Sequence, residues 1–163
     1  MSEIEESGMW LRIFAAISYT VLSTISLSAN LLLLVVFIVG HKRFDRMSYF
    51  IISWQTLVCD LIMLSYQFIQ AIPTTFAARQ LYSPTVMHYM GVLDTIGYNG
   101  VLFFMFILTI SRVTIFFFEK IDRIVFSPPG IYAVIVFVWV LTLTFTVILN
   151  MSGCMKEFTT EAL

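Results

Sequence analysis

Four long runs of apolar residues, separated by short stretches that carry most of the charges, dominate the sequence. Residues 13–39 contain no Asp, Glu, Lys or Arg, and neither do residues 131–150. Residues 48–72 contain one charge, Asp60, while residues 91–118 contain Asp94 near one end and Arg112 near the other. About 20 apolar residues are enough for a helix to cross a bilayer. The pattern therefore predicts four transmembrane helices at about these positions.

The composition agrees with a membrane protein. Hydrophobic residues make up 60% of the 163 residues, and charged residues make up only 12%. A soluble domain carries roughly twice that charged fraction, and a chain of this size cannot bury so much apolar surface within itself. We therefore predict an all-α membrane protein with four transmembrane helices in a single transmembrane domain, residues 1–163.

Basic residues are distributed unevenly between the two ends of the predicted helices, and this predicts an orientation. One end carries six of them: Lys42, Arg43, Arg46, Arg112, Lys120 and Arg123. The other end carries three: Arg12, Arg79 and Lys156. Cytoplasmic loops of membrane proteins are enriched in Lys and Arg. We therefore expect the first group in the cytoplasm and the N-terminus outside.

Charge and residue types also exclude several classes of function. The net charge of −1 leaves no basic excess for binding nucleic acid phosphates. Two cysteines are too few for a disulfide-rich scaffold or a four-cysteine metal site. No nucleophile beside a base, phosphate-binding glycine loop or pair of catalytic carboxylates is apparent. We therefore expect no enzyme activity, no metal and no cofactor.

Asp60 lies in the middle of the second predicted helix, where a charged side chain is costly unless it faces protein or water. Asn30 lies two thirds of the way along the first predicted helix. Because these helices are antiparallel, we expect Asn30 to meet Asp60 in an interhelical hydrogen bond. The alternative is that the two residues form an ion or proton site.

Asp94 and Arg112 lie 18 positions apart in the third predicted helix. This separation is five helical turns, which places both on one face about 27 Å apart, together with Tyr98 and Met105. The predicted orientation puts Asp94 near the outer mouth and Arg112 near the cytoplasmic edge. One interpretation is a central helix whose two ends meet different partners, and the other is that both charges extend to the interfaces.

Four residues, each in its own predicted helix, carry a resemblance to a known family. They are Asn30 in SANLLLLVVFI, Asp60 in SYFIISWQTLVCDLIML, Arg112 in ISRVTIFF and Trp139 in FVWVL. These motifs resemble the first four helices, the first half, of the seven-helix bundle of rhodopsin-type G-protein-coupled receptors. The segment YNGVLFFMFILTISR and the many Phe, Ser and Tyr residues more particularly resemble nematode serpentine chemoreceptors, near the class X group.

The resemblance implies a chemosensory receptor of the plasma membrane. Such a protein would bind an external small molecule at the outer mouth, here through Asp94, Tyr98 and Asn99. It would contact a heterotrimeric G protein through Arg112 and the inner loops. Trp139 would be a packing residue.

The sequence departs from the receptor pattern at several positions. Ser111 and Val113 replace the acid and the tyrosine of the Asp-Arg-Tyr motif. Met87 stands where the family has a disulfide cysteine. The chain covers four of the family's seven helices, so we expect a truncated form that does not signal alone.

Two further functions fit the sequence. The chain could be half of an oligomeric transporter that uses Asp60 and Asp94, with weak support from Gly91, Gly97 and Gly100. It could also be a four-span partner subunit that does not signal.

Overall fold

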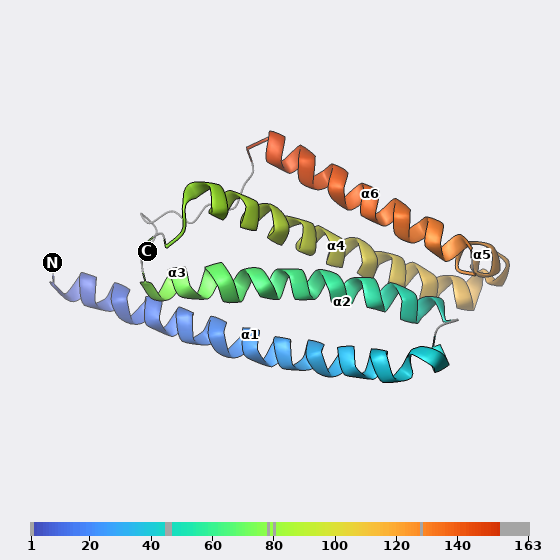
Figure 1. Ribbon diagram of the computed structural model, residues 1–163, viewed down its shortest axis with the longest axis horizontal. Coiled ribbons are helices and arrows are strands. Elements are labelled where there is room, and N and C mark those ends of the chain that lie inside the picture. The colour runs from blue at the N-terminus through green and yellow to red at the C-terminus, as the bar shows by residue number, and fades with distance from the viewer. Residues whose placement is uncertain (1, 45–46, 78, 80, 128, 154–163) are drawn as a thin grey trace.

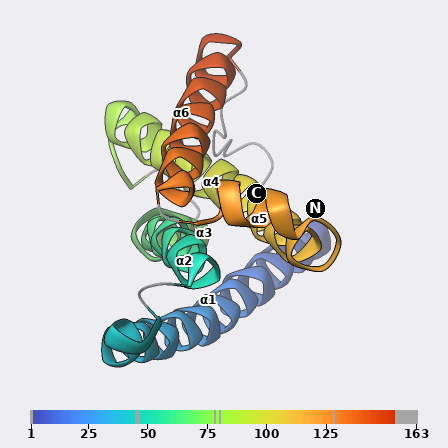
Figure 2. The same ribbon diagram turned by 90° about the vertical axis from the view of Figure 1, so that its right-hand side faces the viewer.

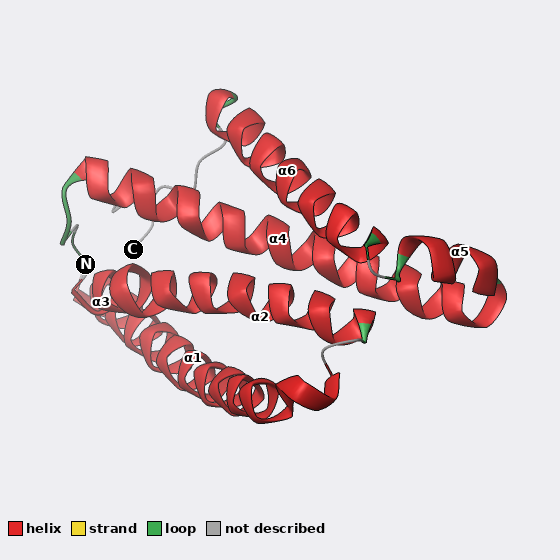
Figure 3. Ribbon diagram, turned by 45° about the vertical axis from the view of Figure 1, so that its right-hand side comes forward, coloured by secondary structure: helices red, strands yellow, loops and turns green. Residues whose placement is uncertain are grey.

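The computed structural model consists of helices joined by short connections (Figures 1 and 3). It describes residues 2–44, 47–77, 79, 81–127 and 129–153, except for the side chains of residues 2–8, 42–44 and 119. The elements are α1 (Ser2–Phe44), α2 (Ser48–Tyr66), the π-helical turn η1 (Gln67–Ala71), α3 (Ile72–Ala77), α4 (Pro84–Phe117), α5 (Glu119–Val125) and α6 (Gly130–Met151). The described residues contain no strand.

Four helical segments in this part of the chain are long and apolar enough to cross a membrane: Met9–His41, Ser48–Ala77, Pro84–Phe117 and Gly130–Met151. The prediction of an all-helical protein with four membrane-spanning helices is confirmed. Large apolar side chains remain exposed along these helices, among them Phe116 at 83% and Val39 at 81%. Such a surface requires lipid around it, so the protein is an integral membrane protein.

The four long helices lie side by side in chain order (Figure 1). α2 and α4 share the most extensive contact and lie at the centre, with α1 and α6 on opposite sides (Figure 2). The fully buried cluster joins α2, α4 and α6 and contains Ile52, Cys59, Phe104, Phe126, Ile131 and Val138. α1 packs on α2 through Phe37, whose ring lies 4.7 Å from that of Phe50 and 5.7 Å from that of Trp54.

Two glycines of α4 permit its close approach to α2. A Cβ atom at Gly97 would lie 2.7 Å from Cγ of Met63 and 3.0 Å from the carbonyl oxygen of Cys59. A Cβ atom at Gly100 would lie 2.5 Å from Sγ of Cys59. Small residues at helix interfaces allow backbones to pack closely in membranes. Gly97 and Gly100 are therefore the residues that set the distance between the two central helices.

The second membrane-spanning segment continues past Pro73, where the sequence indicates the start of a loop. Proline has no N–H to donate to the carbonyl four residues earlier, here that of Ile69. The chain adjusts by forming the π-helical turn just before Pro73, and the Tyr82 hydroxyl donates a hydrogen bond of 2.7 Å to the Ile69 oxygen. The helix therefore extends to Ala77 rather than ending at residue 72.

Other bounds also differ from expectation. α1 extends from Ser2 to Phe44 instead of from residue 13 to residue 39. α4 begins at Pro84, with this proline in its first turn, instead of at residue 91. Proline is favoured at the start of a helix because its missing N–H needs no partner there. The short helix α5 follows α4 and was not predicted. Four of the basic residues on which the predicted orientation rests lie outside the described part. These are Lys42 and Arg43, for the side chain alone, and Arg46 and Lys156 as a whole.

Candidate functional site

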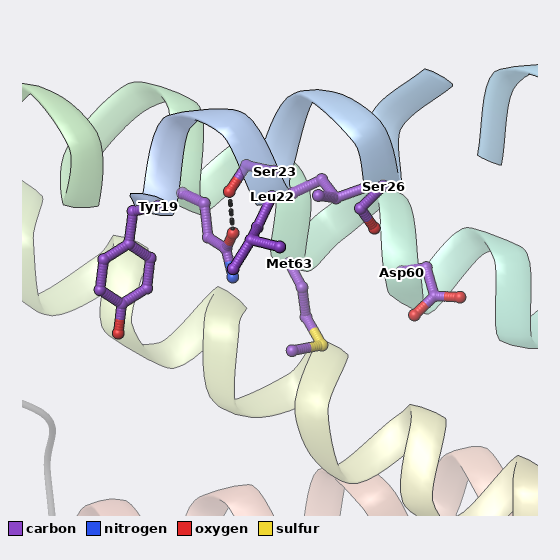
Figure 4. Close-up of a pocket in the computed structure, with 8 residues that line it drawn as sticks. Tyr19, Leu22, Ser23, Ser26, Asp60 and Met63 are labelled. Carbon is purple, nitrogen blue, oxygen red and sulfur yellow. Dashed lines mark hydrogen bonds between the residues drawn. The ribbon is translucent and has the colours of Figure 1, made fainter. Parts of the chain in front are cut away.

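A pocket of about 310 Å³ opens between α1 and the second membrane-spanning segment (Figure 4). Two of its lining residues are joined, since the Ser23 hydroxyl donates a hydrogen bond of 2.6 Å to Oε1 of Gln67. Asp60 lies beside Ser26 at one end, and Tyr19 lies at the opposite end (Figure 4). The lining residues are Tyr19, Leu22, Ser23, Ser26, Asp60, Met63, Leu64 and Gln67.

The residue of α1 that lies near Asp60 differs from the expected one. The Asn30 side-chain amide donates a hydrogen bond of 3.0 Å to the Ser26 carbonyl within α1, so the expected bond from Asn30 to Asp60 is replaced by a local one. Ser26, one turn earlier, lines the pocket with Asp60. The relative depth of two helices depends on their tilt and on the connection between them, and neither follows from the sequence pattern.

The three residues expected to bind a ligand do not gather on one side of α4. Asp94 is 4% exposed and interacts electrostatically with Tyr66 of α2. Tyr98, one turn on, is 48% exposed. Asn99 is 8% exposed and shares a helix face with Phe103, whose ring packs 5.6 Å from that of Phe145 in α6. Asn99 therefore belongs to the α6 side of the helix, apart from Asp94.

Asn99 also presents a donor without an acceptor. Its amide nitrogen is buried and makes no hydrogen bond to the described residues. The same holds for Oε1 of Gln70 and Oγ1 of Thr74, which lie one turn apart in the second membrane-spanning segment. Buried polar atoms normally have a partner, so these three atoms are places where a water, a ligand or a further chain segment would bind favourably.

Trp139 connects α6 to α2. Its indole N–H donates a hydrogen bond of 3.1 Å to Oε1 of Gln55, and its ring meets that of Phe104 edge to face at 5.6 Å. Gln55 was not singled out from the sequence. A glutamine within an apolar transmembrane run could have indicated a polar contact between helices. Trp139 is thus a packing residue that also fixes the position of α6 by a hydrogen bond.

Arg112 lies near the end of α4, at the end of the molecule where α2 begins. Its Nη2 atom donates a hydrogen bond of 3.1 Å to the Tyr49 hydroxyl, and its Cζ atom lies 5.1 Å from the centre of the Tyr49 ring. Both side chains are exposed. This contact could not be predicted from the sequence, since the two residues are far apart along the chain and meet only through the packing of α2 on α4.

The described residues contain no group of three His, Cys, Asp or Glu side chains that could hold a metal ion. Three of the polar regions contain a charged side chain: the pocket at Asp60, the surroundings of Asp94, and the contact of Arg112 with Tyr49. Serine, glutamine and carboxylate groups of this kind bind polar or cationic groups by hydrogen bonds and charge.

Comparison with known proteins gives one match. The sequence profile of DUF621, described as a protein of unknown function, matches residues 2–163. The chain belongs to the DUF621 family. No curated protein and no solved structure matches the chain.

Proposed function

We propose that this DUF621 protein is a receptor-type membrane protein that forms the first four helices of a seven-helix G-protein-coupled receptor. Its role would be chemosensory, with a small external molecule as the ligand and a heterotrimeric G protein as the inner partner. Further helices would complete the bundle before it signals. The proposal places the protein in the plasma membrane with its N-terminus outside.

One observation carries this proposal: the four residues of the receptor resemblance lie in four consecutive packed helices. Asn30 lies in α1, Asp60 in α2, Arg112 in α4 and Trp139 in α6. Arg112 lies at the end of α4 that adjoins the first turn of α2. The uneven distribution of Lys and Arg favours the same end as cytoplasmic, which is where a G protein would bind.

Binding of a G protein tests this proposal directly. The chain would be placed in lipid nanodiscs together with the helices that complete its bundle, and the affinity of the completed bundle would be measured for purified heterotrimers of each Gα class. We expect at least one class to bind, and Arg112→Ala to weaken that binding tenfold or more, since a charged hydrogen-bonding group at an interface centre contributes about that much. Arg79→Ala, an exposed arginine at the opposite end, should leave the affinity unchanged. Absence of binding by every class would refute the proposal.

The ligand would bind near Asp94 and Tyr98 on the outer half of α4. Asp94 lies within the bundle against α2, and a carboxylate there would bind a cationic or hydrogen-bonding group of the ligand. Asn99 lies toward α6 and is left out of this site. A screen of small amines would measure the thermal shift of the protein. We expect an amine to stabilise the wild type and the control Asp122→Asn, and Asp94→Asn to lose this stabilisation.

The pocket at Asp60 favours a second function, half of an oligomeric transporter. A carboxylate beside Ser26 and near the Ser23–Gln67 hydrogen bond, at the middle of a membrane-spanning helix, is typical of an ion or proton pathway. Proteoliposomes containing the chain would then carry sodium ions or protons across the membrane. Asp60→Asn should abolish that flux, whereas a receptor would give none with either sequence.

A further inference from the structure

The contact between Tyr49 and Arg112 combines two interactions on one guanidinium group. The hydrogen bond of 3.1 Å to the Tyr49 hydroxyl uses one nitrogen of Arg112. The distance of 5.1 Å from Cζ to the ring centre is within the range of a cation–π interaction. Tyr49 therefore holds the guanidinium by both its polar and its apolar part.

The backbone that carries Tyr49 is fixed on both sides. The Ser48 hydroxyl donates a hydrogen bond to the carbonyl oxygen of Phe126, and the Phe126 side chain is buried in the core cluster. On the other side, the N–H groups of Phe50 and Ile51 donate to the Met47 carbonyl. The first turn of α2 is therefore anchored to the segment after α5, and Tyr49 is presented to Arg112 from a rigid position.

The residue immediately before Arg112 is not a carboxylate. Ser111 occupies that position and is 2% exposed, and its carbonyl oxygen accepts a hydrogen bond of 2.9 Å from Thr114. A carboxylate beside an arginine would hold it by charge. In this chain the group that holds the guanidinium comes from another helix and is uncharged.

We propose that Tyr49 keeps Arg112 in a resting position, and that a G protein must displace the tyrosine to bind the guanidinium. This inference rests on the proposed function. The G protein segment would offer carbonyl or carboxylate oxygens, which are stronger acceptors for a guanidinium than a phenol hydroxyl. Because Tyr49 and Arg112 are both exposed, their contact is weak enough to be exchanged for such a segment.

Chemical modification of Arg112 tests the resting contact without any G protein. Phenylglyoxal reacts with free guanidinium groups, and the extent of modification at each arginine can be measured by mass spectrometry. In nanodiscs, Tyr49→Phe retains the ring and Tyr49→Leu removes both interactions. We expect Arg112 to react about threefold faster in Tyr49→Phe and about tenfold faster in Tyr49→Leu, with no change at Arg79. Equal rates in all three proteins would overturn the inference.

G protein affinity tests the second half of the inference. Tyr49→Phe removes the hydrogen bond that competes with the G protein for Arg112, so this variant should bind the G protein about fivefold more tightly than the wild type. A fivefold change in affinity is the size expected for the loss of one hydrogen bond to a charged group at an exposed site. Tyr132, 57% exposed in the first turn of α6, is the matched control, and Tyr132→Phe and Tyr132→Leu should change neither measurement.

The two measurements separate the two proposals. If no G protein binds the wild type, the proposed function fails, and displacement by a G protein fails with it. If the wild type binds and Arg112→Ala weakens binding, but the Tyr49 variants leave the affinity unchanged or lower it, the proposed function stands and this inference alone is overturned.

Discussion

At the residue scale, polar side chains inside the membrane determine how the helices are paired. Trp139 of α6 donates to Gln55 of α2, and Ser23 of α1 donates to Gln67 of η1. In hydrocarbon, a polar group without a partner costs free energy, so each such pair favours one arrangement of helices over others. The sequence shows where polar residues interrupt the apolar runs. It does not show which of them meet.

The Gln55–Trp139 hydrogen bond should contribute measurably to stability. A double-mutant cycle with Gln55→Leu and Trp139→Phe, read as the free energy of unfolding in bicelles, should give a coupling of about 0.6–1 kcal/mol, as for other interhelical hydrogen bonds in membranes. Trp139→Phe keeps an aromatic ring near Phe104. Additive effects of the two changes would contradict the account of this contact.

At the element scale, the two central helices pack closely because α4 has glycine where α2 approaches. The obstacle differs between the two glycines. At Gly97, a methyl group would meet the backbone of Cys59 at 3.0 Å and of Met63 at 3.3 Å, besides the Met63 side chain. At Gly100, it would meet chiefly the Cys59 sulfur at 2.5 Å. A backbone cannot move aside as a side chain can, so the two positions should respond differently to substitution.

Gly97→Ala and Gly100→Ala should each destabilise the protein by about 1–3 kcal/mol through overpacking. Adding Cys59→Ala removes the sulfur, after which the nearest atom to a methyl at residue 100 is the Cβ of residue 59 at 3.4 Å. Cys59→Ala should therefore restore most of the stability of Gly100→Ala and little of that of Gly97→Ala. Unfolding measurements on the three single and two double variants would check this, and equal rescue of both would be inconsistent with the packing.

The C-terminal end of the second membrane-spanning segment depends on Tyr82. Pro73 leaves the Ile69 carbonyl without its helical donor, and Tyr82 supplies one. Tyr82→Phe should cost about 1 kcal/mol of unfolding free energy. The cost should be smaller when Pro73 is replaced by Ala, because the restored N–H can donate to Ile69. The same loss in both backgrounds would show that Tyr82 has another role.

Helices of this protein follow from its sequence more readily than their contacts do. The four apolar runs predict the four membrane-spanning helices, because the bilayer requires long apolar segments with internally bonded backbones. The continuation past Pro73 could not be predicted, since the compensating hydroxyl belongs to Tyr82, nine residues later in the chain. That Asp60 shares a pocket with Ser26 while Asn30 bonds within α1, and that Arg112 meets Tyr49, depends on the tilt and relative depth of the helices.

At the scale of the whole molecule, the two ends of the bundle differ in their chemistry. The end with Arg112 has an exposed guanidinium and the first turn of α2, and the other end has Asp94 and the N-terminal parts of α1 and α4 (Figure 1). The receptor interpretation needs the Arg112 end to face the cytoplasm. The transporter interpretation depends instead on the pocket at Asp60 and does not require this orientation.

A receptor that binds a G protein through Arg112 must have the Arg112 end in the cytoplasm, and labelling with a membrane-impermeant reagent measures on which side that end lies. In a background with Cys59→Ala and Cys154→Ala, single cysteines would be introduced as Met47→Cys, at the exposed start of α2, or as Ser83→Cys, at the start of α4. The account predicts that a membrane-impermeant maleimide labels Ser83→Cys in intact cells and Met47→Cys only after permeabilisation. The reverse pattern would place Arg112 outside the cell, where no G protein can reach it, and would contradict the account.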